Sequence, residues 1–197
     1  MTEALALLFP HKYITDFEED NLRRSASNHN FPPKQLSTML RRPTQIIRSF
    51  RNHKGTVYLV AHQEKTGGTS IFSTRIAKAQ SDIIVVSGVI VKNDGHWLSD
   101  YPDWTAILHR IPESSLIVGG FHYDDCVQKF IKIAKAEGRE AKISPILTDL
   151  YYSFSCWPRI LKKSYGTLPM PMCVELDEFL KIKKRYAQQA RAILGLP

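Results

Sequence analysis

The sequence predicts an α/β domain in three layers, with a mostly parallel central sheet and helices on both faces of that sheet. Short apolar runs rich in β-branched residues alternate along the chain with amphipathic segments, the pattern of strands joined by helical crossovers. The clearest such unit is a strand, helix, strand crossover within residues 115–147. Because a crossover of this kind joins parallel strands, helices are expected to cover both sides of the sheet.

Three apolar segments are expected to form the strands that precede this crossover. Residues 4–9 (ALALLF) make a short continuous apolar run, and residues 57–61 (VYLVA) are rich in β-branched and aromatic side chains. Residues 82–91 (DIIVVSGVIV) form the longest apolar stretch. This stretch predicts either one buried strand or a tight pair of strands interrupted at Ser87-Gly88.

Helices are expected between these strands. Residues 20–43 are polar and contain a proline pair, so they predict an irregular connection, and an apolar helix face begins only at Thr44. Lys54-Gly55 is expected to end that helix. Residues 101–108 predict a short helix, because Pro102 and Asp103 suit its first turn.

The crossover contains the strongest local signals of the chain. A strand is expected at residues 115–118 (SLIV), a tight turn at Gly119-Gly120, and a helix at residues 124–137. The next strand, residues 139–147, contains Pro145, which removes a ladder hydrogen bond and predicts an edge strand or an early end. The apolar helix positions, spaced i, i+3, i+4 and i+7, are Val127, Phe130, Ile131 and Ala134.

The whole chain, residues 1–197, is expected to form a single domain. With 43% hydrophobic residues it is long enough for one substantial core and short for two. Residues 174–194 predict a long charged C-terminal helix that covers the domain or contacts a partner subunit. Its candidate packing residues are Leu176, Phe179, Leu180, Ile182, Tyr186 and Ile193.

Composition narrows the classes of protein to consider. The sequence shows neither an apolar run long enough to span a membrane nor a signal-peptide pattern, so a soluble, cytoplasmic protein is expected. Three cysteines without a CxxC pair predict reduced thiols rather than a disulfide framework or a cysteine zinc site.

The formal net charge of +8 is unevenly distributed. Residues 21–55 carry eight Lys and Arg residues and no Asp or Glu. A solvated surface is the ordinary interpretation, and nucleic-acid binding is the alternative. Only Phe31 and Phe50 are aromatic in this segment, so a platform for base stacking is not expected and nucleic acid is not the predicted partner.

The turn after residues 115–118 is the predicted place of the functional site, because reactive groups in an open α/β sheet collect outside the carboxyl ends of the strands. The sequence there reads GGFHYDDCV. Cys126 lies near the first turn of its helix, where unpaired N–H groups and the helix dipole favour a thiolate. Asp124 and Asp125 oppose a negative sulfur, so a nearby cation would be needed. The alternative is a cysteine that serves only as buried packing.

The run from Gly120 to Val127 resembles the signature of the isochorismatase-like cysteine hydrolases, in which a glycine lies six positions before the nucleophilic cysteine and a valine follows it. The resemblance covers roughly residues 44–150, as in a divergent member of the family. It implies Cys126 as the nucleophile. It also implies Lys92, which is 126 − 92 = 34 positions before the cysteine, as the electrostatic partner of the thiolate.

In this family the thiolate attacks a carbonyl or imine carbon, and an aspartate takes and returns the proton. Backbone N–H groups meet the oxyanion, and the resemblance places a non-proline cis peptide between Phe121 and His122. Tyr123 stands where the family has a small hydroxyl residue, and Trp97 lies in a segment that departs from the family pattern. Both changes are expected to reshape the substrate pocket.

The family's aspartate after the first strand lacks a counterpart at its usual place. The family has the pattern D-x-Q-x-D-F in this region, where this sequence reads LLFPHKYITDF. Asp16 and the phenylalanine after it match only the last two residues of that pattern. Three alternatives follow from this departure. Asp16 has moved in through a loop change, His11 acts as the base because imidazole ionises near neutral pH, or the proton shuttle is lost.

The predicted function is a cysteine hydrolase acting on a small amide, imide or vinyl ether. The alternative is a catalytically inactive protein of the same fold that binds a ligand or partner. A catalytic metal and other cofactors are not expected, because His29, His53 and His62 lack the clustered spacing of the nicotinamidase branch. A homo-oligomer is expected from the resemblance, and the sequence does not identify the substrate.

Overall fold

The structure of the protein is a computed structural model. The described residues are 3–10, 33–64, 79–93, 96–99, 102–120, 122–148 and 171–194. Of the predicted site residues, His11, Asp16 and Phe121 lie outside these ranges, and only the backbone is described for Lys92 and Trp97.

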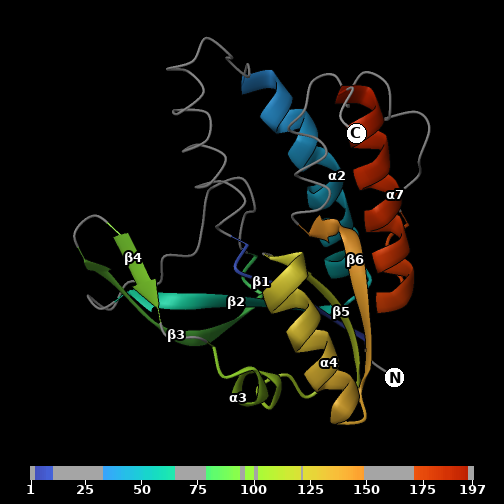
Figure 1. The fold of residues 1–197 in the computed structure, drawn as a ribbon. Helices are drawn as coiled ribbons and strands as arrows, with labels where there is room; N and C mark the ends of the chain where they lie inside the picture. Colours follow the sequence, from blue (N-terminus) through green and yellow to red (C-terminus); the bar gives the residue numbers. More distant parts are fainter. Residues whose placement is uncertain are drawn as a thin grey trace.

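A six-stranded sheet forms the centre of the described residues, in the order β4-β3-β2-β1-β5-β6 (Figure 1). Neighbouring strands are parallel except for β4, which pairs antiparallel with β3. The predicted mostly parallel sheet is therefore confirmed. The strands are β1 Glu3–Leu8, β2 Thr56–Glu64, β3 Ile83–Asn93, β4 His96–Ser99, β5 Ser115–Gly120 and β6 Glu140–Thr148.

The strand order reverses between β1 and β5. The chain leaves β1 toward β2 and β3 on one side, and later returns to add β5 and β6 on the other side of β1. The carboxyl ends of the two central strands meet in register, because Leu8 pairs with Gly120. Such a switch point opens the crevice in which doubly wound sheets bind their ligands.

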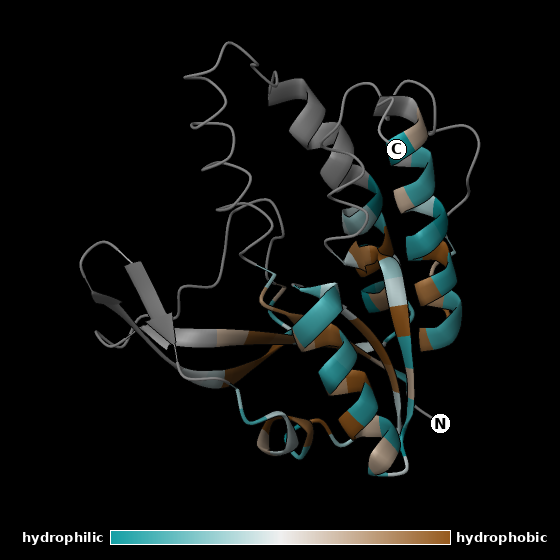
Figure 2. Ribbon diagram, viewed as in Figure 1, coloured by the Kyte–Doolittle hydropathy of each residue, from teal (hydrophilic) through white to brown (hydrophobic). Residues whose placement is uncertain are grey.

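Helices cover both faces of the sheet, which confirms the predicted three layers. Helix α2, Pro33–Asn52, lies over one face, where its Ile47 packs with Leu5 and Leu7 of β1. Helices α3 (Trp104–Leu108), α4 (Gln128–Ala136) and α7 (Leu176–Leu194) contribute to the larger core on the opposite face. Figure 2 shows apolar residues concentrated in the central strands and hydrophilic residues along much of α7.

Helix α2 is longer than the sequence predicted. It begins at Pro33, so the expectation of an irregular connection over residues 20–43 is wrong from that residue onward. A proline suits the first turn of a helix, where its missing N–H would lack an intrahelical acceptor anyway. Pro43 lies inside the helix and is buried, so tertiary packing offsets the backbone hydrogen bond that it removes.

Strand β3 is one continuous strand rather than a pair. Ala61 of β2 pairs with Val86, and the next residue of β2 pairs with Gly88, so Ser87 is the extra residue of a β-bulge. The Ser87 hydroxyl donates a hydrogen bond to the Ala61 carbonyl oxygen at 3.1 Å. The hairpin partner β4 was not predicted from the sequence.

Two glycines end β5 instead of forming the predicted tight turn. A Cβ on Gly119 would lie 2.6 Å from the Leu147 Cβ, and a Cβ on Gly120 would lie 2.0 Å from the Leu8 carbonyl oxygen. The prediction of a turn was wrong because close contact with the neighbouring strands, rather than a change of direction, requires glycine at both positions.

Other predictions about the elements are confirmed. The strand that contains Pro145 lies at the edge of the sheet. Asp103 caps α3, and its carboxylate accepts a hydrogen bond from the Ala106 amide at 3.0 Å. Within α7, the predicted packing residues Phe179, Ile182 and Tyr186 are buried, whereas the prediction for Leu180 is wrong, because its side chain is exposed. Among helices in the described part of the chain, we find none with the length and apolar character needed to cross a membrane.

Candidate active site

Cys126 lies at the start of the helix that follows β5, next to the switch point. A single π-helical turn, η1 (Tyr123–Val127), leads into α4. The His122 carbonyl oxygen accepts hydrogen bonds from the amides of Asp125 at 3.2 Å and Val127 at 3.1 Å. Val127, the residue that follows the cysteine, is fully buried and packs in the core. The helix expected over residues 124–137 therefore begins with a wide turn, a feature often found at functional sites.

The Cys126 thiol has a carboxylate beside it. Cys126 is partly buried against the larger core, and its Sγ lies 3.9 Å from Asp125 Oδ2, within hydrogen-bonding reach of a sulfur atom. Asp125 Oδ1 in turn forms an ion pair with the Lys129 ammonium at 2.6 Å. One helical turn thus brings together a thiol, a proton acceptor and a cation.

The second carboxylate of the turn is also paired. Asp124 Oδ1 accepts a hydrogen bond from the Lys183 ammonium of α7 and another from Gln128 Nε2 at 3.4 Å. The charges of both carboxylates that precede Cys126 are therefore balanced by lysines, Lys129 and Lys183, that were not predicted. The i, i+4 spacing of Asp125 and Lys129 was a signal for that pair, but the sequence had no comparable signal for Lys183.

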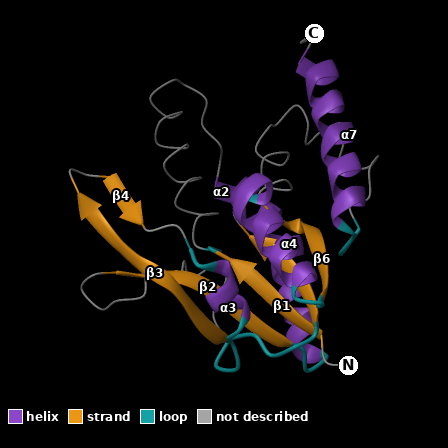
Figure 3. Cartoon of the chain, turned by 60° about the horizontal axis from the view of Figure 1, so that its bottom comes forward, coloured by secondary structure: helices purple, strands orange, loops and turns teal. Residues whose placement is uncertain are grey.

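The backbone of Lys92 is not beside Cys126. Through the pairings of β1 and β2, Gly120 is level with Val85 of β3. Lys92 lies 92 − 85 = 7 positions farther along β3, where it pairs with Trp97. Seven extended residues span about 20 Å, far more than a lysine side chain. The β3–β4 hairpin points away from α4 in two views (Figures 1 and 3), so the structure does not bring Lys92 to the thiol.

The remaining predicted site residues occupy different places. His122 is exposed at the start of η1, and the Tyr123 ring packs edge to face against Phe179 of α7, with 5.8 Å between ring centroids. Trp97 belongs, by its backbone, to the hairpin. His11, Asp16 and the peptide bond preceding His122 lie outside the described residues. The alternatives for the family's aspartate therefore stay predictions.

Directly after β1, the chain places an aromatic residue rather than a carboxylate. Phe9 is buried, with a φ of 50°, and its amide donates a hydrogen bond to the Val60 carbonyl oxygen at 2.9 Å. Its ring lies edge to face with Trp104 of α3 at 6.0 Å between centroids. The residue directly after β1 is therefore part of the core.

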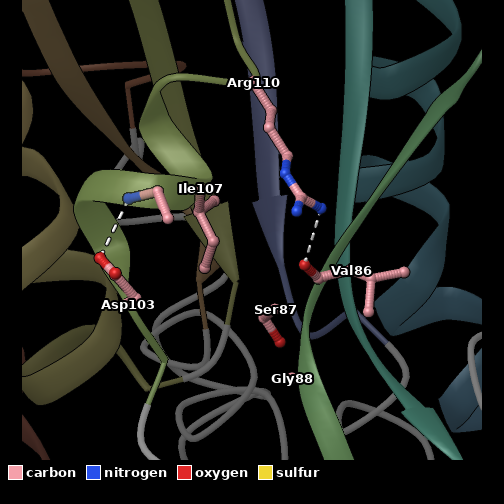
Figure 4. A pocket seen from close by; sticks show the side chains of 7 residues that line it. Val86, Ser87, Gly88, Asp103, Ile107 and Arg110 are labelled. Carbon is pink, nitrogen blue, oxygen red and sulfur yellow. Dashed lines mark hydrogen bonds between the residues drawn. The ribbon is translucent and has the colours of Figure 1, made fainter.

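A separate cavity of about 390 Å³ lies between β3 and α3. Figure 4 shows the Arg110 guanidinium reaching across it to donate a hydrogen bond to the Val86 carbonyl oxygen at 3.3 Å. Cys126 does not line this cavity. Its lining residues are Val86, Ser87, Gly88, Asp103, Ala106, Ile107 and Arg110. Over the described ranges, we find no cluster of three or more His, Cys, Asp or Glu side chains that could hold a metal ion.

No protein-family model and no curated protein matches the sequence. The structure is similar to that of a cysteine hydrolase from Pseudomonas syringae pv. phaseolicola 1448A, at 10% identity and a TM-score of 0.47, covering 98% of this chain and 92% of that one. It is also similar to N-carbamoylsarcosine amidase from Thermoplasma acidophilum, at 12% identity and a TM-score of 0.46, covering 84% and 94% respectively.

A third similar structure is an isochorismatase family protein from Desulfovibrio vulgaris subsp. vulgaris str. Hildenborough, at 13% identity and a TM-score of 0.45, covering 99% of this chain and 92% of that one. These low-identity neighbours fit the divergent resemblance predicted from the sequence. At 10–13% identity and TM-scores of 0.45–0.47, the likeness carries no conclusion about the activity or substrate of this chain.

Proposed function

We propose that the protein is a cysteine hydrolase acting on a small amide, imide or vinyl ether, with Cys126 as its nucleophile. The observation that supports this proposal is the position of the thiol at the switch point of the sheet, with the Asp125 carboxylate 3.9 Å from Sγ. A nucleophile with a proton acceptor in reach, itself held by a third group, is the arrangement that covalent catalysis needs.

For an amide substrate the chemistry follows from these groups. Asp125 accepts the thiol proton, the thiolate attacks the carbonyl carbon, and the C–N bond breaks as the proton moves to the leaving nitrogen. Water then attacks the thioester, which releases the acid and restores the thiol. The Lys129 ammonium, at 2.6 Å from Asp125, holds this carboxylate in place and balances its charge.

A catalytically inactive protein of the same fold that binds a ligand or partner is the second candidate. One observation favours it: the Lys92 backbone lies far along the hairpin. The lysine that the resemblance implies as the partner of the thiolate is therefore not beside Cys126.

Turnover of a panel of small amides separates these two candidates. We expect Cys126→Ala to abolish hydrolysis and Asp125→Asn to lower kcat/KM by about 100-fold, with circular dichroism unchanged in both variants. Cys173→Ala is the control and should leave kcat/KM unchanged. Burial raises the pKa of the Cys173 thiol, with the Glu3 charge adding to the effect, so this residue is mostly a thiol at neutral pH.

Iodoacetamide labelling at pH 7.5 provides a measurement that needs no substrate. We expect peptide mapping to show Cys126 modified faster than Cys173. Burial and neighbouring carboxylates raise the pKa of the Cys173 thiol, whereas Cys126 lies at the start of a helix with Asp125 Oδ2 3.9 Å from its Sγ. If no amide acylates Cys126 and its labelling is no faster than that of Cys173, the proposed activity is excluded.

A further inference from the structure

Two ion pairs at separated points connect the segment of η1 and α4 to α7 and the residue before it. Near the end of α4, the Lys135 ammonium contacts the Glu175 carboxylate at 2.6 Å. At the opposite end, Lys183 forms the ion pair with Asp124 of η1. Because the positions increase along α7 as they decrease toward the start of α4, the two helices are antiparallel, as Figure 1 shows.

At the cysteine end, α7 contacts η1 through aromatic packing as well as through the ion pair. Phe179 is fully buried and packs edge to face against Tyr123, and Lys183 Nζ lies 4.9 Å from the centroid of the same Tyr123 ring. An ammonium over an aromatic ring is an additional favourable contact. Residues of α7 therefore contact both the Tyr123 ring and the Asp124 carboxylate, which lie three and two positions before Cys126.

The charges around this turn balance in pairs. Among the described residues, the charged groups of the turn and its contacts are Asp124, Asp125, Lys129 and Lys183. The other titratable side chains there, besides Cys126 itself, are His122 and Tyr123. Removing the Lys183 ammonium leaves the Asp124 carboxylate, two positions before Cys126, without its cation. A like charge of that kind disfavours a thiolate.

We propose that Lys183 is a positioning residue for Cys126, through which α7 neutralises Asp124 and favours the thiolate at the start of α4. This inference rests on the proposed function only in taking Cys126 as the reactive group. It assigns to the C-terminal helix a role in the chemistry of the site in addition to its role in the core.

The test is the pH dependence of Cys126 alkylation by iodoacetamide, followed by peptide mass spectrometry on the full chain. Lys183→Met should move the midpoint of the rate profile upward by about 0.5 pH unit, the size expected when a partly exposed neighbouring charge is unmasked. Lys183→Arg keeps the charge and should restore the profile of the natural chain.

Lys135→Met is the matched control, because it breaks the ion pair of α4 with Glu175, the residue before α7, at the end of α4 remote from the sulfur. It should leave the midpoint unchanged. The double variant Asp124→Asn/Lys183→Met should return the midpoint to that of the natural chain, since the carboxylate that Lys183 neutralises is then gone. Coinciding profiles for Lys183→Met and Lys135→Met would overturn the inference.

Failure of the proposed function is visible separately. Alkylation requires no substrate, so a shifted midpoint in Lys183→Met together with no hydrolysis of any amide supports the positioning role and contradicts the hydrolase. Hydrolysis of an amide by the natural chain, together with an unshifted midpoint in Lys183→Met, supports the hydrolase and contradicts the positioning role.

Discussion

At the scale of single residues, Gly120 shows why the two central strands can approach each other at the switch point. Its φ is 124°, a conformation that residues with a Cβ rarely adopt. An added Cβ would also lie 2.0 Å from the carbonyl oxygen of Leu8, the residue paired with it in β1. The glycine of the cysteine signature is thus required by backbone packing before any chemistry is considered.

Replacement of Gly120 by alanine should therefore destabilise the protein strongly. We expect Gly120→Ala to lower the free energy of unfolding in urea by about 3 kcal/mol or more. Gly138→Ala is the control, because Gly138 also has a positive φ, 75°, but a Cβ there meets no atom within 4 Å. The control should cost only about 1 kcal/mol, and equal losses for both variants would contradict the steric explanation.

At the scale of elements, one buried ion pair connects the end of α2 to the start of β3. Arg51 Nε donates a hydrogen bond to Asp82 Oδ1 at 2.9 Å, and the second guanidinium contact reaches Oδ2. The Asp82 side chain is fully buried and also accepts a hydrogen bond from the Ala79 amide at 2.9 Å. Arg51, one of the eight basic residues of segment 21–55, is therefore not part of a solvated surface.

Removing the arginine should leave a buried carboxylate without its cation. Arg51→Met is expected to lower the free energy of unfolding by about 3 kcal/mol, measured by urea denaturation. Lys181→Met breaks an exposed pair with Glu178, 3.5 Å apart, and should change stability by less than about 0.5 kcal/mol. A loss from Arg51→Met as small as that of the control would show that Asp82 finds other compensation.

At the scale of the whole molecule, Tyr58 links the sheet to the loop after α3. Tyr58 is 2% exposed, and its hydroxyl donates a hydrogen bond to Glu113 Oε1 at 3.2 Å. Burial, followed by the hydrogen bond and charge of Glu113, raises the pKa of Tyr58 from 10.0 to about 12. The neutral phenol is therefore favoured in the folded protein, so its stabilising effect is complete below pH 10 and is lost as the pH rises to about 12.

We accordingly expect the free energy of unfolding to fall between pH 10 and pH 12, with about 2 kcal/mol of that decrease due to Tyr58. The measurement is urea denaturation across this range for the natural chain and for Tyr58→Phe. The variant should lose correspondingly less stability as the pH rises. Tyr186, whose pKa is also raised by burial, is present in both proteins and cancels from the comparison. Parallel curves would contradict the assignment.

The single domain over residues 1–197 and the homo-oligomer stay predictions at this scale, as does a small molecule as the substrate. The basic segment 21–55 is described only in part, and within that part Arg42 and Arg48 are exposed on α2. Exposure of this kind agrees with a solvated surface, the ordinary interpretation of a basic run.

The sequence by itself determined the class of the fold and the kind of each main element. Apolar runs, proline and glycine positions and capping side chains act over a few residues, so they predicted β1, the edge strand with Pro145 and the cap of α3 at Asp103. The same local pattern placed Cys126 at the start of a helix after a strand.

Only the tertiary structure decided which charged groups surround that cysteine. The register of β3 carries Lys92 away along the hairpin, while the packing of α7 brings Lys183 to Asp124 from 59 positions later in the chain. Such pairings depend on strand register and helix packing between distant segments, which a pattern of neighbouring residues does not contain.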